Sequence, residues 1–345
     1  MTNQHEITKR MPLLNREGNL TEPGWARGLL WDYHRPDIRA SGMRIKEWDY
    51  YFVSNGHIGL ALTIADNGYM GLDSVSYLDF DEKWEITKSP MRLLPMGKTA
   101  LPETSAAGSS EIARGGYALA FYHDDDGTRK LTFHMDKFRG KDAIEGMISL
   151  SDEPAESMVI ATPFEKSGHF YYNQKINCMR ASGWIELGGA RVELEPETWF
   201  AVLDWGRGVW TYHNTWYWGS ASGELDGVPF GWNIGYGFGD TRAASENVLF
   251  YGGKIHKLSQ VRFEIPMQDG KEDYLAPWRF SSDDGRFEMA FTPILNRAAY
   301  TSVGVIKSDQ NQVFGRFTGT AALDDGTVLQ VNDFFGFAEK VENKW

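Results

Sequence analysis

The densest group of residues able to do chemistry lies between Trp199 and Asn247. Within this segment, the block from Asp204 to Trp218 interleaves ionisable side chains with aromatic rings. A carboxylic acid held in an apolar pocket keeps its proton near neutral pH, and a histidine can accept or donate one there. Four residues are therefore candidates for acid–base chemistry: Asp204, Arg207, His213 and Glu246.

The role of Asp204 depends on its neighbour Arg207. Unpaired in an apolar pocket, Asp204 would be a proton donor, whereas pairing with the guanidinium of Arg207 would keep it ionised. The two residues could instead form a structural ion pair at a glycine-bounded turn, with His213 satisfying a buried backbone group. Glu246 could likewise lie in solvent at the entrance of a strand. Spacing alone leaves these alternatives open.

The surrounding aromatic residues predict a cavity for an apolar molecule, since the chain holds 13 Trp, 15 Tyr and 20 Phe. From Phe230 to Gly239, alternate positions place rings on one strand face, and glycines with Asn233 on the other. The bare face would let a ligand approach Asn233, or would simply let the strand coil. The residues assigned to the cavity wall are Trp205, Tyr212, Trp216, Trp218, Trp232, Asn233 and Trp48.

An antiparallel framework must position these residues. Hairpin dipeptides between short apolar or alternating runs recur along the whole chain. They are Asn67-Gly68, Asp126-Gly127, Gly188-Gly189, Asp226-Gly227, Gly252-Gly253, Asp284-Gly285 and Asp325-Gly326. Seven turns with two strands each predict about fourteen strands. Helix is a minor component, and the segment from Asp142 to Leu150 is the candidate for irregular or helical structure.

We predict an all-β fold of two packed halves, because a single barrel of this many strands would be unusual and open edges invite aggregation. The expected divisions are an N-terminal extension (1–40), a first β half (41–190) and a second β half (191–345). A faint repeat supports two halves, since Lys46-Glu47-Trp48-Asp49-Tyr50-Tyr51 resembles Asn214-Thr215-Trp216-Tyr217-Trp218-Gly219. The stretch from Pro102 to Gly116 reads as a surface loop or a lid.

Composition and charge limit the partners. The net charge of −12 and the absence of a Lys/Arg run disfavour nucleic acid and anionic membranes. The single cysteine, Cys178, is expected to be a buried thiol, and the eight dispersed histidines disfavour a metal site. Neither a signal peptide nor a membrane-spanning apolar segment is evident. We expect a cytoplasmic protein without a cofactor or metal, which binds a small hydrophobic molecule.

Several blocks together resemble the bacterial family named domain of unknown function 2804. They are Gly24-Trp25-Ala26, the Lys46 to Tyr51 block, His169-Phe170-Tyr171-Tyr172-Asn173-Gln174-Lys175-Ile176-Asn177, the Asp204 to Trp218 block and Glu246-Asn247. More distantly, the region around His213 is similar to the lipocalin-like AttH and carotenoid hydratase (hydroxyneurosporene synthase) group. This resemblance implies two consecutive calycin-type β-barrel halves with a ligand cavity in or between them. That group carries an Asp-His pair ahead of its Trp-rich strand, where this chain has Tyr212-His213-Asn214.

Two functions fit these features. The first is a cofactor-independent lyase or isomerase, of hydratase or cyclase type, on an isoprenoid or lipid-like substrate; Asp204 or Glu246 would be the acid, His213 the base and Arg207 an electrostatic tuner. Protonation of an alkene creates a cation that ring faces stabilise. The second is a non-catalytic carrier of an apolar ligand. A third alternative is a structural protein whose aromatic face meets another chain.

Overall fold

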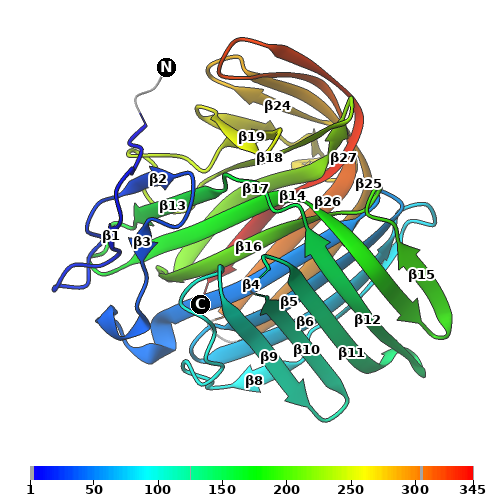
Figure 1. Ribbon diagram of the computed structural model, residues 1–345, viewed down its shortest axis with the longest axis horizontal. Helices are drawn as coiled ribbons and strands as arrows, with labels where there is room; N and C mark the ends of the chain where they lie inside the picture. Colours follow the sequence, from blue (N-terminus) through cyan, green and yellow to red (C-terminus); the bar gives the residue numbers. More distant parts are fainter. Residues whose placement is uncertain (1–3, 125, 304–305, 345) are drawn as a thin grey trace.

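The computed structural model describes residues 4–124, 126–303 and 306–344, and almost all of its regular structure is β-strand. Two large antiparallel sheets dominate (Figure 1). The first sheet has the order β7 (Trp84–Lys88), β6 (Met70–Asp79), β5 (Ile58–Asp66), β4 (Ile45–Ser54), β16 (Phe200–Val209), β14 (Phe170–Leu187), β12 (Asp142–Ser151), β11 (Arg129–Arg139), β10 (Tyr117–His123) and β9 (Gly108–Arg114). Four more strands pair at its margins: β13 (Met158–Pro163), β15 (Ala190–Leu194), β8 (Met91–Leu93) and β2 (Gly24–Ala26).

The second sheet has the order β20 (Lys254–Lys257), β19 (Val248–Tyr251), β18 (Val228–Tyr236), β17 (His213–Leu225), β27 (Val328–Lys344), β26 (Ile306–Ala322), β25 (Phe287–Val303), β24 (Trp278–Ser282) and β21 (Val261–Glu264). Minor elements are β1 (Met11–Pro12) with β3 (Trp31–Asp32), β22 (Met267–Gln268) with β23 (Lys271–Glu272), and two 3₁₀ turns, η1 (Arg35–Asp37) and η2 (Gly42–Arg44). No helix in the described part of the chain is long and apolar enough to cross a membrane.

The two sheets share one strand plan. In each, a four-strand meander (β4 to β7, β17 to β20) begins with a strand that also pairs with the last strand of the same half, β16 or β27. The repeated sequence blocks lie on β4 and β17, the two starting strands. The chain changes sheet between Val209 and His213, so β16 belongs to the first sheet although it follows residue 190. The division into domains itself stays a prediction.

All seven predicted dipeptides join paired strands. At one of them, Asp226 and Gly227 have φ values of +51° and +80°, as a two-residue type I′ hairpin requires. The expectation of about fourteen strands was too low, because other turns connect further strands. The expectation for Asp142 to Leu150 was also wrong: this segment is β12, which buries alternate residues Ile144, Ile148 and Leu150 between β11 and β14.

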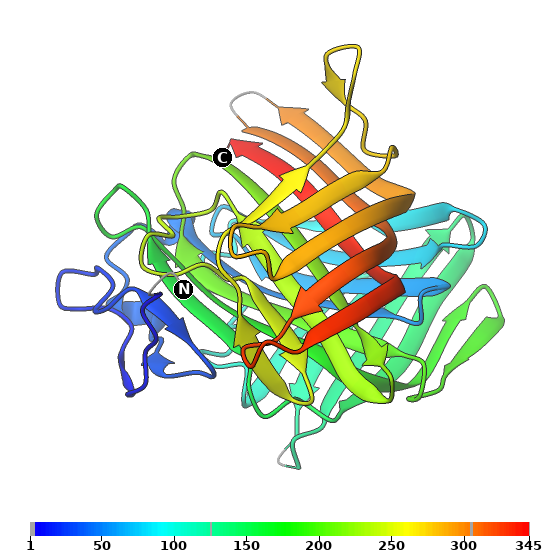
Figure 2. The same cartoon turned by 90° about the horizontal axis from the view of Figure 1, so that it is seen from above.

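Apolar residues pack in four clusters, one of which lies between β13 and β14 of the first sheet and β19 and β20 of the second. One core lies on the face of the first sheet that points away from the second, and another lies within the curled second sheet. A third layer joins the sheets, with Phe52 of the first sheet against Phe314 and Phe337 of the second. Figure 2 shows the orange and red strands β25 to β27 packed across the blue and cyan strands of the first sheet. This inter-sheet layer surrounds the candidate site.

Candidate functional site

A cavity of about 300 Å³ lies between the two sheets. From the first sheet, one row of residues in cross-strand register faces it: Lys175, Asp204, Tyr50, Thr63 and Ser74. From the second sheet, another row in register faces it: Arg297, Gln312, Glu339 and Trp218. Because side chains alternate along a strand, every second residue of these strands points into the same space. The cavity therefore runs across the strands.

Five aromatic rings form a box at the end of the cavity beside β14 and β16. They are Trp48, Tyr171, Trp210, Trp216 and Phe238. Neighbouring ring centroids lie 4.8 to 6.2 Å apart, mostly edge to face. Gly206 permits this packing, because a Cβ there would lie 1.9 Å from the Trp48 ring. The box offers ring faces to an apolar or cationic group.

Asp204 is the ion-paired carboxylate of the cavity. Its Oδ2 lies 2.9 Å from Nζ of Lys175, which is directly opposite on β14. Its Oδ1 accepts a hydrogen bond of 2.6 Å from the amide of Asn173. The Lys175 ammonium also lies 3.9 Å from the centroid of the Trp218 ring. Lys175 therefore binds both a carboxylate and a ring face.

Glu339 is a second carboxyl group in the same space. Its two oxygens accept hydrogen bonds from the indole of Trp216, at 2.9 Å, and the amide of Gln312, at 3.0 Å. Burial raises the pKa of Glu339 to about 7, although these donors and the nearby cations oppose the shift. At neutral pH a large fraction of this group is protonated. Such a carboxyl group has the pKa that a general acid needs near neutral pH.

Glu246 is the third carboxyl group, and the amide of Asn233 fixes it. The Asn233 Nδ2 donates to the Glu246 carboxylate at 3.1 Å and to its carbonyl at 2.9 Å, while Oδ1 accepts from the indole of Trp218 at 2.7 Å. Burial raises the pKa of Glu246, and the positive charge of Lys175 opposes this. Asn233 therefore orients a ring and a carboxyl group together.

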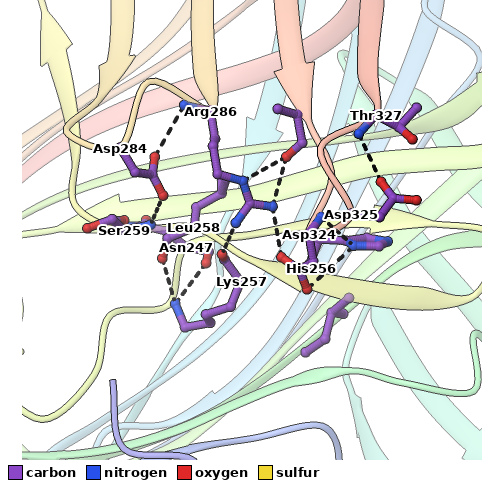
Figure 3. Close-up of polar contacts among 12 residues, drawn as sticks. Asn247, His256, Lys257, Leu258, Ser259, Asp284, Arg286, Asp324, Asp325 and Thr327 are labelled. Carbon is purple, nitrogen blue, oxygen red and sulfur yellow. Dashed lines mark hydrogen bonds and ion pairs between the residues drawn. The ribbon is translucent and has the colours of Figure 1, made fainter. Parts of the chain in front are cut away.

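The residues beside Glu246 are held by a buried polar cluster (Figure 3). Asn247 accepts from the Gly235 amide at 2.6 Å and donates to the Ser259 carbonyl at 2.9 Å. The Lys257 ammonium donates to the Ser245 hydroxyl and to the carbonyls of Asn247 and Leu258. Burial lowers the pKa of Lys257 to about 7. Since its three donors are satisfied by this loop, Lys257 positions Glu246 and does not enter the cavity.

The structure brings part of the predicted site together. Asp204, Glu246, Trp48, Trp216 and Trp218 all line the cavity. Asn233 lies directly behind it, fully buried, and contacts the cavity through its partners.

Arg207 does not pair with Asp204. Residues three apart on a strand face opposite ways, so Arg207 points away from the cavity, with a fully buried side chain. Its guanidinium donates to Asp49 at 3.0 Å and to the Pro102 carbonyl at 2.8 Å. The contact with Pro102 ties the start of the segment from Pro102 to Gly116 to the face of the first sheet opposite the cavity. The prediction of a surface loop or lid for this segment was wrong in its larger part, because Gly108–Arg114 is β9 and pairs with β10. These buried contacts indicate that Arg207 stabilises the first sheet rather than binding a ligand in the cavity.

Four other predicted residues lie outside the cavity. Trp205 packs on the Arg207 face of β16, and Trp232 is buried in the core of the second sheet. Tyr212 and His213 are exposed, because they lie at the connection between the sheets. The prediction that Phe238 shares a face with Trp232 was also wrong, since β18 ends at Tyr236 and the turn at Gly237, with φ +89°, redirects the chain.

Two further histidines and the single cysteine lie elsewhere. His34 and His57 are exposed beside Glu103 and Asp81 and do not line the cavity. Cys178 is buried, and burial raises the pKa of its thiol to about 12, so it is a poor nucleophile. Within residues 4–124, 126–303 and 306–344, no cluster of His, Cys, Asp and Glu fits a metal ion.

The sequence did not point to three charged residues that line the cavity: Lys175, Glu339 and Arg297. Lys175 is the single charged residue on its face of β14 from Tyr171 to Asn177, and Glu339 is the single charged residue on its face of β27 from Phe335 to Asn343. An isolated charge among uncharged residues on one strand face was the available signal. Their convergence depends on contacts between two sheets, which no local pattern encodes.

Residues 4–345 match the family model described as Domain of unknown function (DUF2804). The chain belongs to the DUF2804 family. No curated protein matches the sequence. Among solved structures, a Nitrosomonas europaea protein provisionally described as AttH is similar to this DUF2804 chain with a TM-score of 0.53 and 13% identity, covering 87% of this chain and 92% of that one.

Two further solved structures match with a TM-score of 0.49. Kievitone hydratase from Nectria haematococca is 9% identical, covering 97% of this DUF2804 chain and 98% of that one. CghA is 10% identical and covers 97% of each chain. The likeness to the Nitrosomonas europaea structure shows that the chain has the predicted lipocalin-like, all-β fold.

Proposed function

We propose that this protein is a cofactor-independent lyase of the hydratase type, which acts on a small unsaturated apolar molecule in the cavity between the sheets. One observation carries the proposal: a single aromatic-walled cavity holds the ion-paired carboxylate Asp204 together with Glu339, whose pKa is raised to about 7. Two carboxyl groups in different environments are how proteins supply an acid and a base at one pH.

The proposed step adds water to a carbon–carbon double bond. Glu339 gives its proton to one alkene carbon, which forms a C–H bond and leaves a cation at the other carbon. Ring faces of Trp216 and Trp218 stabilise that cation. The oxygen of a water molecule bonds to the cation, and Asp204 takes the proton released. Asp204 then releases its proton to solvent and Glu339 takes one up, so both groups return to their starting states and the net reaction joins one alkene and one water.

This assignment changes three roles from the sequence hypothesis. The acid passes from Asp204 or Glu246 to Glu339, whose pKa is raised to about 7. The base passes from His213 to Asp204, because His213 is exposed outside the cavity. The electrostatic partner passes from Arg207 to Lys175, which binds Asp204 directly. Glu246 lines the cavity as its third carboxyl group and takes no part in the proposed step.

A panel of unsaturated terpenoid and acyl compounds tests the proposal. Each is incubated with the protein at pH 6, where Glu339 is mostly protonated, and products that differ by the mass of one water are sought by mass spectrometry. We expect such a product from the wild type, and none from Glu339→Gln or Asp204→Asn with ligand binding retained. The control Glu342→Gln changes a carboxylate on the same strand that faces away from the cavity and should retain turnover.

Stoichiometric binding in the wild type without any change in ligand mass would contradict catalysis. The protein would then be a carrier of apolar molecules. A rate that does not fall as pH rises above about 7 would contradict the role of Glu339 as acid.

A further inference from the structure

The entrance of the cavity lies at one edge of the two sheets. β7 pairs only with β6 and is the edge strand of the first sheet's main path. In the second sheet, β24 pairs with β25 only as far as Phe291, so the later half of β25 has no strand partner on that side among the described residues. Residues of both free edges line the cavity. Thr87 lies on β7 and Ser89 follows its end, while Ala298 and Ala299 lie on β25. Solvent and ligand therefore reach the cavity between these edges.

Arg297 stands just inside this entrance, where its positive charge acts on the carboxyl group of Glu339 without direct contact. The other cation lining the cavity, Lys175, pairs with Asp204. No carboxylate in the described part of the chain lies within ion-pair distance of Arg297. Its Nη1 donates to the Ser76 hydroxyl of the first sheet at 2.8 Å. This contact fixes the guanidinium across the gap between the sheets.

No hydrogen bond to a described residue engages Nε or Nη2 of Arg297, and these two donors form one edge of the guanidinium. The same edge binds a carboxylate elsewhere in this molecule: Nε and Nη2 of Arg92 donate to the two oxygens of Asp73 at 2.8 and 2.9 Å. Such paired donors match a planar oxyanion and favour it over a neutral group.

The polar entrance and the aromatic box lie at opposite ends of the cavity. Arg297 and Glu339 are two strands apart in register, about 10 Å. A molecule that spans this distance would place one end on Arg297 and its body beside Glu339 and the rings. A cavity of about 300 Å³ is at the small end of ligand pockets.

We propose that the substrate is an amphiphile, with an anionic oxygen group such as a carboxylate that binds Arg297 and an unsaturated apolar body that enters the aromatic box. Arg297 is then the residue that selects acids over neutral analogues. This inference deepens the proposed function, because it names the substrate class of the same cavity.

Two fluorescent probes with the same aromatic body test this selection without turnover. 8-Anilino-1-naphthalenesulfonate carries an anionic group, and N-phenyl-1-naphthylamine does not. We expect the wild type to bind the sulfonate about tenfold more tightly than the neutral amine, because a charge-assisted hydrogen bond contributes about that much affinity. Arg297→Gln should remove this preference and leave the affinity for the neutral probe within twofold. Arg297→Lys should retain part of it, because the charge remains.

Two further variants test whether the probes bind in the cavity. Ala299→Trp should weaken both probes by obstructing the entrance, and Arg262→Gln, at an exposed position on β21, should change neither. Equal affinity of the wild type for both probes, equal loss of both in Arg297→Gln, or unaltered binding in Ala299→Trp would overturn the inference. Because the readout is affinity, a failure to find any hydrated product leaves this result interpretable and bears only on the proposed function.

Discussion

Replacement of Glu339 by glutamine should change how stability depends on pH. The folded state raises the pKa of this carboxyl from its ordinary 4.5 to about 7. Between these values the folded protein holds a proton that the unfolded chain releases, so the free energy of unfolding falls as pH rises. The free energy of unfolding stops falling once the pH exceeds the folded-state pKa of about 7. With about 1.4 kcal/mol for each pKa unit, the wild type loses about 3 kcal/mol from this group between pH 4 and pH 8.

The Glu339→Gln variant lacks this titration and keeps a side chain of the same shape beside Trp216 and Gln312. Urea unfolding at several pH values gives the free energy of unfolding of both proteins. The variant should gain about 3 kcal/mol relative to the wild type between pH 4 and pH 8. The other carboxylates contribute equally to the pH dependence of both proteins, so their contributions cancel in this difference. Glu342→Gln is the control on the same strand. A difference that stays constant with pH would refute the raised pKa and with it the role of Glu339 as acid.

Three further predictions concern residues around the cavity. Gly206→Ala should lower the free energy of unfolding by about 2 kcal/mol and shift tryptophan fluorescence, because the new methyl group displaces the Trp48 ring; an unchanged spectrum would contradict this packing. Arg207→Met should cost about 3 to 5 kcal/mol in urea unfolding, because Asp49 loses its buried partner, while probe binding in the cavity stays unchanged; weakened probe binding would count against the separation of the two faces. The thiol of Cys178 should resist a disulfide reagent at pH 8 in the folded protein and react in urea, since its pKa is about 12; rapid reaction of the native protein would disprove the burial.

Local signals predicted most of the framework. Dipeptides such as Asp226-Gly227 adopt positive φ at low cost, so they mark hairpins wherever they join apolar runs. The segment from Asp142 to Leu150 was misread because Gly146, which is buried in alternation with Ile144 and Ile148, interrupts the alternation of apolar side chains in the sequence. That strand forms because β11 and β14 supply partners on both sides, which is information from distant parts of the chain.

The candidate site was predictable only in part. Asp204, Trp216 and Trp218 could be found because chemistry-bearing residues and rings are dense in that one segment. Strand alternation shows which residues share a face, but it does not show which face meets the other sheet. Trp205 was therefore placed in the cavity although it packs on the opposite side of β16. Arg297 enters the site only because β25 crosses the first sheet.

The most direct test of catalysis follows the oxygen of water. An unsaturated compound that binds the protein is incubated in oxygen-18-labelled water at pH 6, once with the wild type and once with Glu339→Gln. The mass of the recovered compound is then measured by mass spectrometry. We expect one labelled hydroxyl group in the product of the wild type and none with the variant, which should bind the compound as tightly. Recovery of bound but unlabelled and unaltered compound from the wild type would contradict the proposed hydration.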